Sequence, residues 1–340
     1  MRKVYITGNN GFLARNLIKR INSQFSDKLF VATEGTEDLI LTDNDEIDIV
    51  ENPYEILKDW IERAKIDVIV HNAAIVGTDV VAINARKAVD VNVYGTYVIA
   101  QIASELNIPI IYIGTTVIYD TFLVNETKEA ITEDTSIYPR TLYASSKYEG
   151  EMILNMYCRK SGYAILRPLF CYGGIGDMNS LIAKSVYNVV SSTNEEFKIF
   201  LDPNNMKDYM HAYDFVDAIA HSIINKSYLK LEDYNVSLNQ PMKTSDIADL
   251  IDSTLCREIS KYIKWEPDTD YLGYHIIDNL KFKKHHPEWN PSITLEQGIK
   301  MYYNDLVADV LVGEGNYNPL KHLQQIEKDD VDILKHYAKK

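Results

Sequence analysis

The sequence predicts an α/β protein whose core is a doubly wound parallel sheet, covered by helices on both faces. In the first half of the chain, short apolar runs alternate with segments of helical period. These apolar runs are continuous rather than alternating, which is typical of strands that are buried on both sides. Beyond Gly173 the alternation weakens and charged loops lengthen, which indicates a second, smaller lobe.

The expected elements follow in order along the chain. Strands are expected at residues 4–6, 29–32, 39–41, 67–71, 109–113 and 163–166. Helices are expected at residues 12–21, 54–64, 85–106 and 143–159. We divide the chain into a first domain of residues 1–173, a discontinuous lobe of residues 174–312 and a polar C-terminal extension of residues 313–340. The apolar run near residues 234–237 is expected to return one strand to the main sheet.

Composition narrows the class of partner. The chain has 340 residues and a formal net charge of −14, which argues against nucleic acid or an anionic membrane as a general partner. Three cysteines without regular spacing do not form a disulfide framework, so a reducing cytoplasm is the expected location. No run approaches the roughly 20 apolar residues of a membrane span, and no secretory h-region precedes the first strand.

A glycine loop joins the first strand to the first helix. It runs from Gly8 to Ala14, and its glycines permit a tight turn in which backbone N–H groups approach a pyrophosphate. The helix N-terminus behind it adds a favourable dipole. Glu34, at the end of the second strand, can accept hydrogen bonds from ribose hydroxyls and would repel a 2′-phosphate. The first domain is therefore predicted to be a Rossmann-type domain that binds NAD, with NADP as the alternative that the nearby Arg15 favours.

Tyr143 and Lys147 lie four residues apart in a predicted helix and so share one of its faces. A free tyrosine, with a pKa of about 10, is a poor base at neutral pH, but a nearby ammonium and a cationic nicotinamide ring would lower that pKa. The pair could then take a proton from a substrate hydroxyl while hydride leaves the same carbon. Thr115 follows the strand at 109–113, at the sheet edge where ligands bind in open α/β folds.

These motifs together resemble the extended short-chain dehydrogenase/reductase family, and in particular its nucleotide-sugar epimerases and dehydratases. The resemblance runs from residue 3 to about residue 250 and includes Arg167–Gly173 and Lys207–Asp214. It implies that Tyr143 is the base, that Lys147 lowers its pKa and holds the nicotinamide ribose, that Thr115 binds the reacting hydroxyl, and that Asn92 supports the active-site helix. The implied cofactor-binding residues are Gly8, Asn10, Gly11, Phe12, Leu13, Glu34, Asn72, Ala73, Ala74, Asn92, Tyr143, Lys147 and Arg167. The implied substrate-binding residues are Thr115, Thr116, Tyr143, Cys171 and Lys207, and no metal site is expected.

The two residues after Thr115 bear on the type of reaction. Family members that eliminate water from a sugar carry an acidic pair there, and this chain has Thr116 and Val117. The resemblance therefore favours a 4-epimerase that acts through a transient 4-keto sugar. An NADPH-dependent 4-ketosugar reductase, a reductase of steroid- or flavonoid-like substrates and a non-catalytic dinucleotide-binding regulator remain as alternatives.

The substrate lobe departs from the family pattern at several positions. Cys171 stands where an asparagine is usual, and a small buried residue is the simpler interpretation. Lys207 replaces an arginine, so a phosphate would meet a point charge rather than a bidentate fork. Asp120 replaces a glycine, and His211 is expected to be a structural hydrogen-bonding residue. The family also forms dimers through helices equivalent to 85–106 and 143–159, so the resemblance implies a homodimer.

Overall fold

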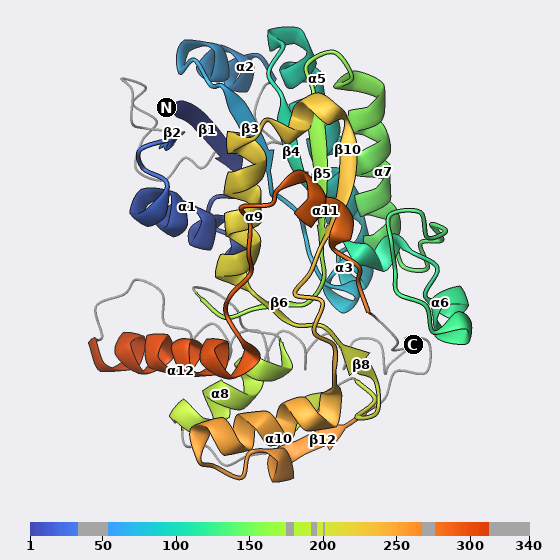
Figure 1. Cartoon of the computed structure of the whole chain (residues 1–340). Coiled ribbons are helices and arrows are strands. Elements are labelled where there is room, and N and C mark those ends of the chain that lie inside the picture. Colours follow the sequence, from blue (N-terminus) through green and yellow to red (C-terminus); the bar gives the residue numbers. More distant parts are fainter. Residues whose placement is uncertain (33–53, 175–179, 192–195, 200, 267–275, 313–340) are drawn as a thin grey trace.

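A computed structural model describes residues 1–32, 54–174, 180–191, 196–199, 201–266 and 276–312. Its centre is a six-stranded parallel sheet in the order β10-β5-β4-β3-β1-β2 (Figure 1). The strands are β1 (Arg2–Thr7), β2 (Leu29–Ala32), β3 (Val68–His71), β4 (Ile110–Ile113), β5 (Tyr163–Pro168) and β10 (Glu232–Val236). The predicted α/β fold with a parallel sheet is confirmed. The strand expected near residues 234–237 is β10, which lies parallel to β5.

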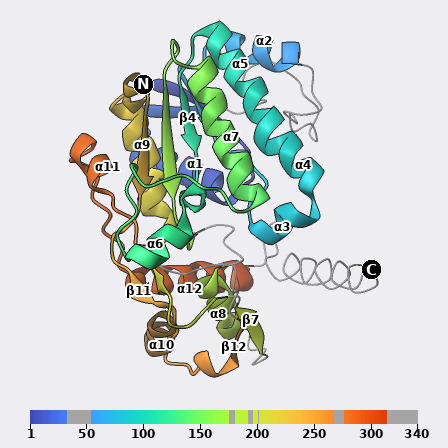
Figure 2. The same cartoon turned by 90° about the vertical axis from the view of Figure 1, so that its right-hand side faces the viewer.

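Successive side chains of β1 point to opposite faces of the sheet and separate two apolar layers. Val4 and Ile6 pack against α1 (Phe12–Gln24) and α9 (Ala212–Ile224), in a cluster that also holds Phe282 of α11 (Leu280–His285). Tyr5 packs on the other face against Trp60 of α2 (Tyr54–Arg63), in a cluster shared with α5 (Thr96–Leu106) and α7 (Leu142–Tyr157). In Figure 2, α5 and α7 run side by side on that face.

The helix predicted over residues 85–106 is divided into three parts. It comprises α4 (Ala85–Val89), a π-helical turn η1 (Asp90–Gly95) and α5. A short helix, α3 (Thr78–Ile83), precedes it. Such π-helical turns occur mostly as single turns inside α-helices and are frequent at functional sites, and this one contains the buried Asn92.

The second lobe packs three helices together below the sheet in Figure 1: α8 (Leu181–Ser191), α10 (Thr244–Leu255) and α12 (Leu295–Val312). Short strand pairs accompany them: β6 (Cys171–Tyr172) with β9 (Met210–His211), β7 (Phe197–Ile199) with β12 (Ile263–Trp265), and β8 (Met206–Lys207) with β11 (Met242–Lys243). The remaining short elements are η2 (Thr116–Ile118), α6 (Thr121–Thr127), η3 (Ser227–Lys230) and η4 (Ser260–Tyr262). Glu34, the strand expected at 39–41 and the extension at 313–340 lie outside the described residues.

No helix in the described ranges is long and apolar enough to cross a membrane.

Candidate active site

The loop after β1 lies at the point where the sheet reverses its winding, because β1 pairs with β2 on one side and β3 on the other. Gly8 has a φ of +65°, and a Cβ there would lie 2.8 Å from the Cα of Ala73. The Gly11 N–H donates to the Gly8 carbonyl over 2.9 Å, and α1 begins at Phe12 without a side-chain cap. The close backbone approach and the uncapped helix N-terminus fit the pyrophosphate of a dinucleotide.

The residues that follow β3 are held against this loop by a buried chain of hydrogen bonds. Thr7 Oγ1 accepts from the N–H groups of Asn72 (3.1 Å) and Ala73 (3.0 Å) and lies 2.7 Å from His71 Nδ1. His71 Nε2 lies 2.9 Å from Thr96 Oγ1, which donates to the Asn92 carbonyl over 2.6 Å. These partners assign the Nε2–H tautomer to His71, and burial lowers its pKa to about 3, so the ring is neutral.

Asn92 connects this chain of hydrogen bonds to the helix that carries the predicted catalytic pair. Its Oδ1 accepts from the Ile75 N–H over 2.7 Å, and its Nδ2 donates to the Ile75 carbonyl and to Ser146 Oγ, each over 3.0 Å. Ser146 in turn donates to the Tyr143 carbonyl over 2.8 Å. Asn92 therefore links the segment that follows β3 to α7 through Ser146.

Helix α7 begins at Leu142, after Thr141 caps it by accepting the Ala144 N–H over 3.1 Å. Tyr143 is half-buried; burial raises the pKa of its phenol to about 12, and a hydrogen bond with Thr115 opposes that shift. Lys147, one turn further, is 2% exposed, and burial lowers the pKa of its ammonium to about 7.

The Lys147 side chain lies over an aromatic ring of the sheet. Its Nζ is 4.1 Å from the ring centroid of Tyr112 on β4. Gly150 lets the backbone of α7 lie close to the same tyrosine, because a Cβ there would lie 2.2 Å from the Tyr112 hydroxyl. Cation–π contact with a buried ring stabilises the charged form of an amine. The Tyr112 ring therefore partly offsets the cost of burying the Lys147 ammonium.

Thr115 and Thr116 follow β4 but have different surroundings. Thr115 caps η2 by accepting the Val117 N–H over 3.4 Å, and its hydroxyl also lies close to the Tyr143 phenol. Thr116 is fully buried and donates to the Pro168 carbonyl over 3.4 Å. The substrate contact expected of Thr116 therefore needs correction, because its side chain is turned into the scaffold.

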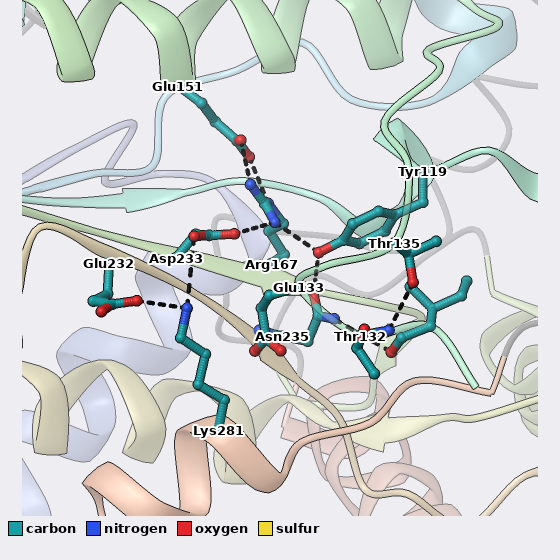
Figure 3. Close-up of polar contacts among 11 residues, drawn as sticks. Tyr119, Thr132, Glu133, Thr135, Glu151, Arg167, Glu232, Asp233, Asn235 and Lys281 are labelled. Carbon is teal, nitrogen blue, oxygen red and sulfur yellow. Dashed lines mark hydrogen bonds and ion pairs between the residues drawn. The ribbon is translucent and has the colours of Figure 1, made fainter. Parts of the chain in front are cut away.

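Arg167 also departs from the expectation. The Arg167 side chain is 4% exposed. Its guanidinium makes two hydrogen bonds to Glu151 on α7, one hydrogen bond to the Tyr119 hydroxyl, and an ion pair with Asp233 on β10 (Figure 3). It is enclosed by these partners and has no open face toward a cofactor, so the predicted cofactor contact is replaced by an internal network.

Two further predicted substrate residues, Lys207 and Cys171, lie on the short strands β8 and β6. Lys207, on β8, is fully buried with its Nζ 4.8 Å from the Phe170 ring centroid, and burial lowers its pKa to about 7. Cys171 is half-buried on β6. His211 caps α9 by accepting the Tyr213 N–H over 3.2 Å at Nδ1.

Asp120 also has a structural partner set. It caps α6 and forms an ion pair with Arg140 over 3.0 Å. Its carboxylate is therefore used to attach α6 to the segment that precedes Tyr143.

The structure brings together the residues that the sequence placed in separate motifs, namely the Gly8 loop, Asn72–Ala74, Asn92, Thr115, Tyr143 and Lys147. Several buried polar residues of this site were not predicted, namely Thr7, His71, Thr96, Ser146 and Glu151. The spacing in the sequence could have indicated Glu151, because it follows Lys147 by four residues and so shares its helix face. Among the described residues, no group of three or more His, Cys, Asp or Glu side chains could hold a metal ion.

A parallel sheet with a glycine loop at its switch point defines the class of dinucleotide-binding α/β enzymes. A model of the NAD dependent epimerase/dehydratase family matches residues 4–237, and the chain belongs to this family. Its members depend on NAD, so the predicted cofactor class is confirmed.

Individual relatives differ in the reaction that their names state. The chain is 25% identical to dTDP-D-glucose 4,6-dehydratase of Mus musculus over 318 residues. This alignment covers 88% of this chain and 87% of the relative. The chain is 29% identical to GDP-6-deoxy-D-talose 4-dehydrogenase of Aggregatibacter actinomycetemcomitans over 228 residues. This alignment covers 66% of this chain and 70% of the relative. The structure of UDP-glucose 4-epimerase from Thermotoga maritima superposes with a TM-score of 0.73 at 19% identity, covering 91% of this chain and 99% of that one.

Proposed function

We propose that the protein is a nucleotide-sugar 4-epimerase that acts through a transient 4-keto sugar. The observation that carries the proposal is the closeness of the Tyr143 phenol to the Thr115 hydroxyl, one helical turn from the buried Lys147. The position after Thr115 supports it further, because Thr116 is buried in the scaffold and Val117 has no acidic group. A site with a tyrosine base and no second acid suits reversible oxidation better than elimination.

The roles of the side chains follow from this arrangement. Thr115 orients the C4 hydroxyl, and Tyr143 takes its proton, which returns to the oxygen at the end of the cycle. Lys147 stabilises the phenolate, since a nearby positive charge favours the ionised form of a phenol. The nicotinamide cofactor, when bound, supplies the acceptor and donor of hydride. The Gly8 loop and the residues that follow β3 would hold it.

The proposal predicts interconversion of C4 epimers without net consumption of cofactor. Purified protein would be incubated with substoichiometric NAD and a panel of UDP-, dTDP- and GDP-sugars, and the epimers separated by chromatography. Substrate deuterated at C4 should keep its label in the product, because hydride returns to the same carbon. A stoichiometric requirement for NADPH would contradict the epimerase. Tight cofactor binding without turnover of any sugar would instead favour a regulator.

A 4-ketosugar reductase is the second candidate, and one relative favours it. The chain is similar to GDP-6-deoxy-D-talose 4-dehydrogenase, whose name states oxidation at the same carbon. A reductase needs the same Thr115, Tyr143 and Lys147, so the site by itself suits both reactions. The two are distinguished by adding a 4-keto nucleotide sugar with NADPH, because only a reductase would oxidise one NADPH for each sugar.

The proposed assembly is a homodimer formed through η1, α5 and α7. This face exposes Tyr94 (51%), Met152 (50%) and Met156 (74%), and the rings of Tyr97 and Tyr157 pack edge-on beside them at 5.4 Å. An exposed apolar face of this kind marks a protein interface. We expect a dimer in sedimentation at micromolar concentration, and monomers after the double change Met152→Glu and Met156→Glu. Leu229→Glu, at an exposed position on η3, is the matched control that should stay dimeric; a monomeric unmodified protein would contradict the proposal.

A further inference from the structure

Arg167 is the centre of a buried polar network that links three parts of the fold. Its Nε and Nη2 donate to the two carboxylate oxygens of Glu151 on α7, over 3.0 and 2.7 Å. Its Nη1 donates to the Tyr119 hydroxyl over 2.6 Å and pairs with Asp233 on β10 (Figure 3). Tyr119 donates onward to Asn235 Oδ1 over 2.8 Å. One guanidinium therefore joins the helix of Tyr143, the segment of Thr115 and the edge strand of the sheet.

The network lies directly beside the predicted catalytic threonine. Gly114 precedes Thr115, and a Cβ at Gly114 would lie 2.8 Å from Glu151 Oε1 and 3.1 Å from Arg167 Cγ. The Glu151–Arg167 pair is therefore packed against the backbone that delivers Thr115. A side chain at residue 114 would displace either the pair or the threonine.

Glu151 also presents its charge to Lys147, one helical turn away on the same face. The other titratable groups that face Lys147 are Tyr143 on the same helix, Tyr112 on β4 and His71 on β3. None of them supplies a negative charge at neutral pH, because burial raises the pKa of both phenols and lowers that of His71. Burial lowers the pKa of Lys147, and Glu151 is the group that raises it.

The charge of Glu151 depends on its own partners. Burial raises the pKa of this carboxyl, and the bidentate contact with Arg167 opposes that shift. Asp233 faces the same guanidinium, and Lys281 of α11 lies 3.7 Å from Asp233. Asp233 has Lys281 as a second cationic neighbour on the β10 side, so Glu151 is the acidic member of this cluster that lies on α7.

We propose that Glu151, clamped by Arg167, is a positioning residue of the active site, which keeps Lys147 charged and fixes α7 against the Thr115 segment. The mechanistic consequence rests on the proposed function, because Lys147 must be cationic to stabilise the Tyr143 phenolate. Arg167, expected from the sequence to contact the cofactor, then acts on the chemistry only through Glu151 and Tyr119.

The test is the variant Glu151→Gln, read first by the titration of Lys147. Reductive methylation of the folded protein across a pH series, with mass spectrometry of the Lys147 peptide, gives the midpoint at which this amine becomes reactive. We expect the midpoint of the unmodified protein near the pKa of about 7. In the variant it should fall by about one unit or more, as expected for loss of a neighbouring opposite charge. A purely structural role predicts no shift in this midpoint.

Turnover is the second readout. With the Lys147 pKa about one unit lower, the charged fraction at pH 7 falls from roughly one half to roughly one tenth, so kcat should fall roughly fivefold. The deficit relative to the unmodified protein should shrink as the pH is lowered, since the amine is then protonated in both proteins. The labelling needs no sugar, so failure of the proposed function leaves that readout intact, whereas an unchanged midpoint overturns the inference even if epimerisation is confirmed.

Two further variants complete the design. Glu149→Gln, at an exposed position of the same helix, is the matched control that should leave both the midpoint and kcat unchanged. Glu151→Asp keeps the charge but shortens the bidentate contact, so its midpoint should stay near that of the unmodified protein while kcat falls. Should Glu151→Gln fail to fold, Glu151→Asp carries the test, and an unchanged kcat in that variant would overturn the positioning role.

Discussion

Replacement of Tyr143 by phenylalanine should reduce kcat by about 10²–10⁴-fold, the range that positioned acid–base groups contribute. The change removes one hydroxyl and keeps the ring, which is half-buried at the start of α7. The lost group is the one that meets Thr115 and is proposed to take the substrate proton. Steady-state kinetics on the substrate found with the sugar panel would measure the loss.

Cofactor binding separates this effect from misfolding. The Tyr143→Phe variant should bind NAD nearly as tightly as the unmodified protein, because the Gly8 loop does not involve the hydroxyl. Tyr94→Phe, at an exposed position on η1, is the matched control that should keep full activity. If Tyr143→Phe kept more than about a tenth of kcat, the tyrosine would not be the base.

Replacement of Arg167 by methionine should lower the free energy of unfolding by about 3–5 kcal/mol, the usual cost when one partner of a buried ion pair is removed. Methionine fills much of the same volume but leaves Glu151, Asp233 and the Tyr119 hydroxyl without their shared donor. The Glu151 carboxylate would then be buried beside an uncharged side chain. Urea denaturation followed by circular dichroism would give the change.

A second substitution shows whether the unpaired charge is the cause. The double variant Arg167→Met with Glu151→Met should be more stable than Arg167→Met alone, since an apolar pair leaves one fewer buried charge without a partner. Arg159→Met, at an exposed position after α7, should change stability by no more than about 0.5 kcal/mol. An Arg167→Met protein as stable as the Arg159→Met control would contradict the network's structural role.

Local sequence patterns predict much of the fold. The strands β1, β3, β4 and β5 were predicted from continuous apolar runs, because a strand buried on both faces needs apolar residues at every position. The division of residues 85–106 by η1 was missed, since a π-helical turn changes the hydrogen-bond register without changing composition. The placement of the second lobe beneath the sheet depended on contacts between segments far apart in the chain.

By itself, the sequence determined the class of fold, the position of the glycine loop and the pairing of Tyr143 with Lys147, because these depend on local spacing along one element or one turn. The tertiary structure decided which polar side chains face the site. It turned Thr116 toward Pro168 and enclosed Arg167 between Glu151 and Asp233. A buried charge must find a partner wherever the fold supplies one, and β10 brings Asp233 to Arg167 across 66 residues of chain that no local pattern spans.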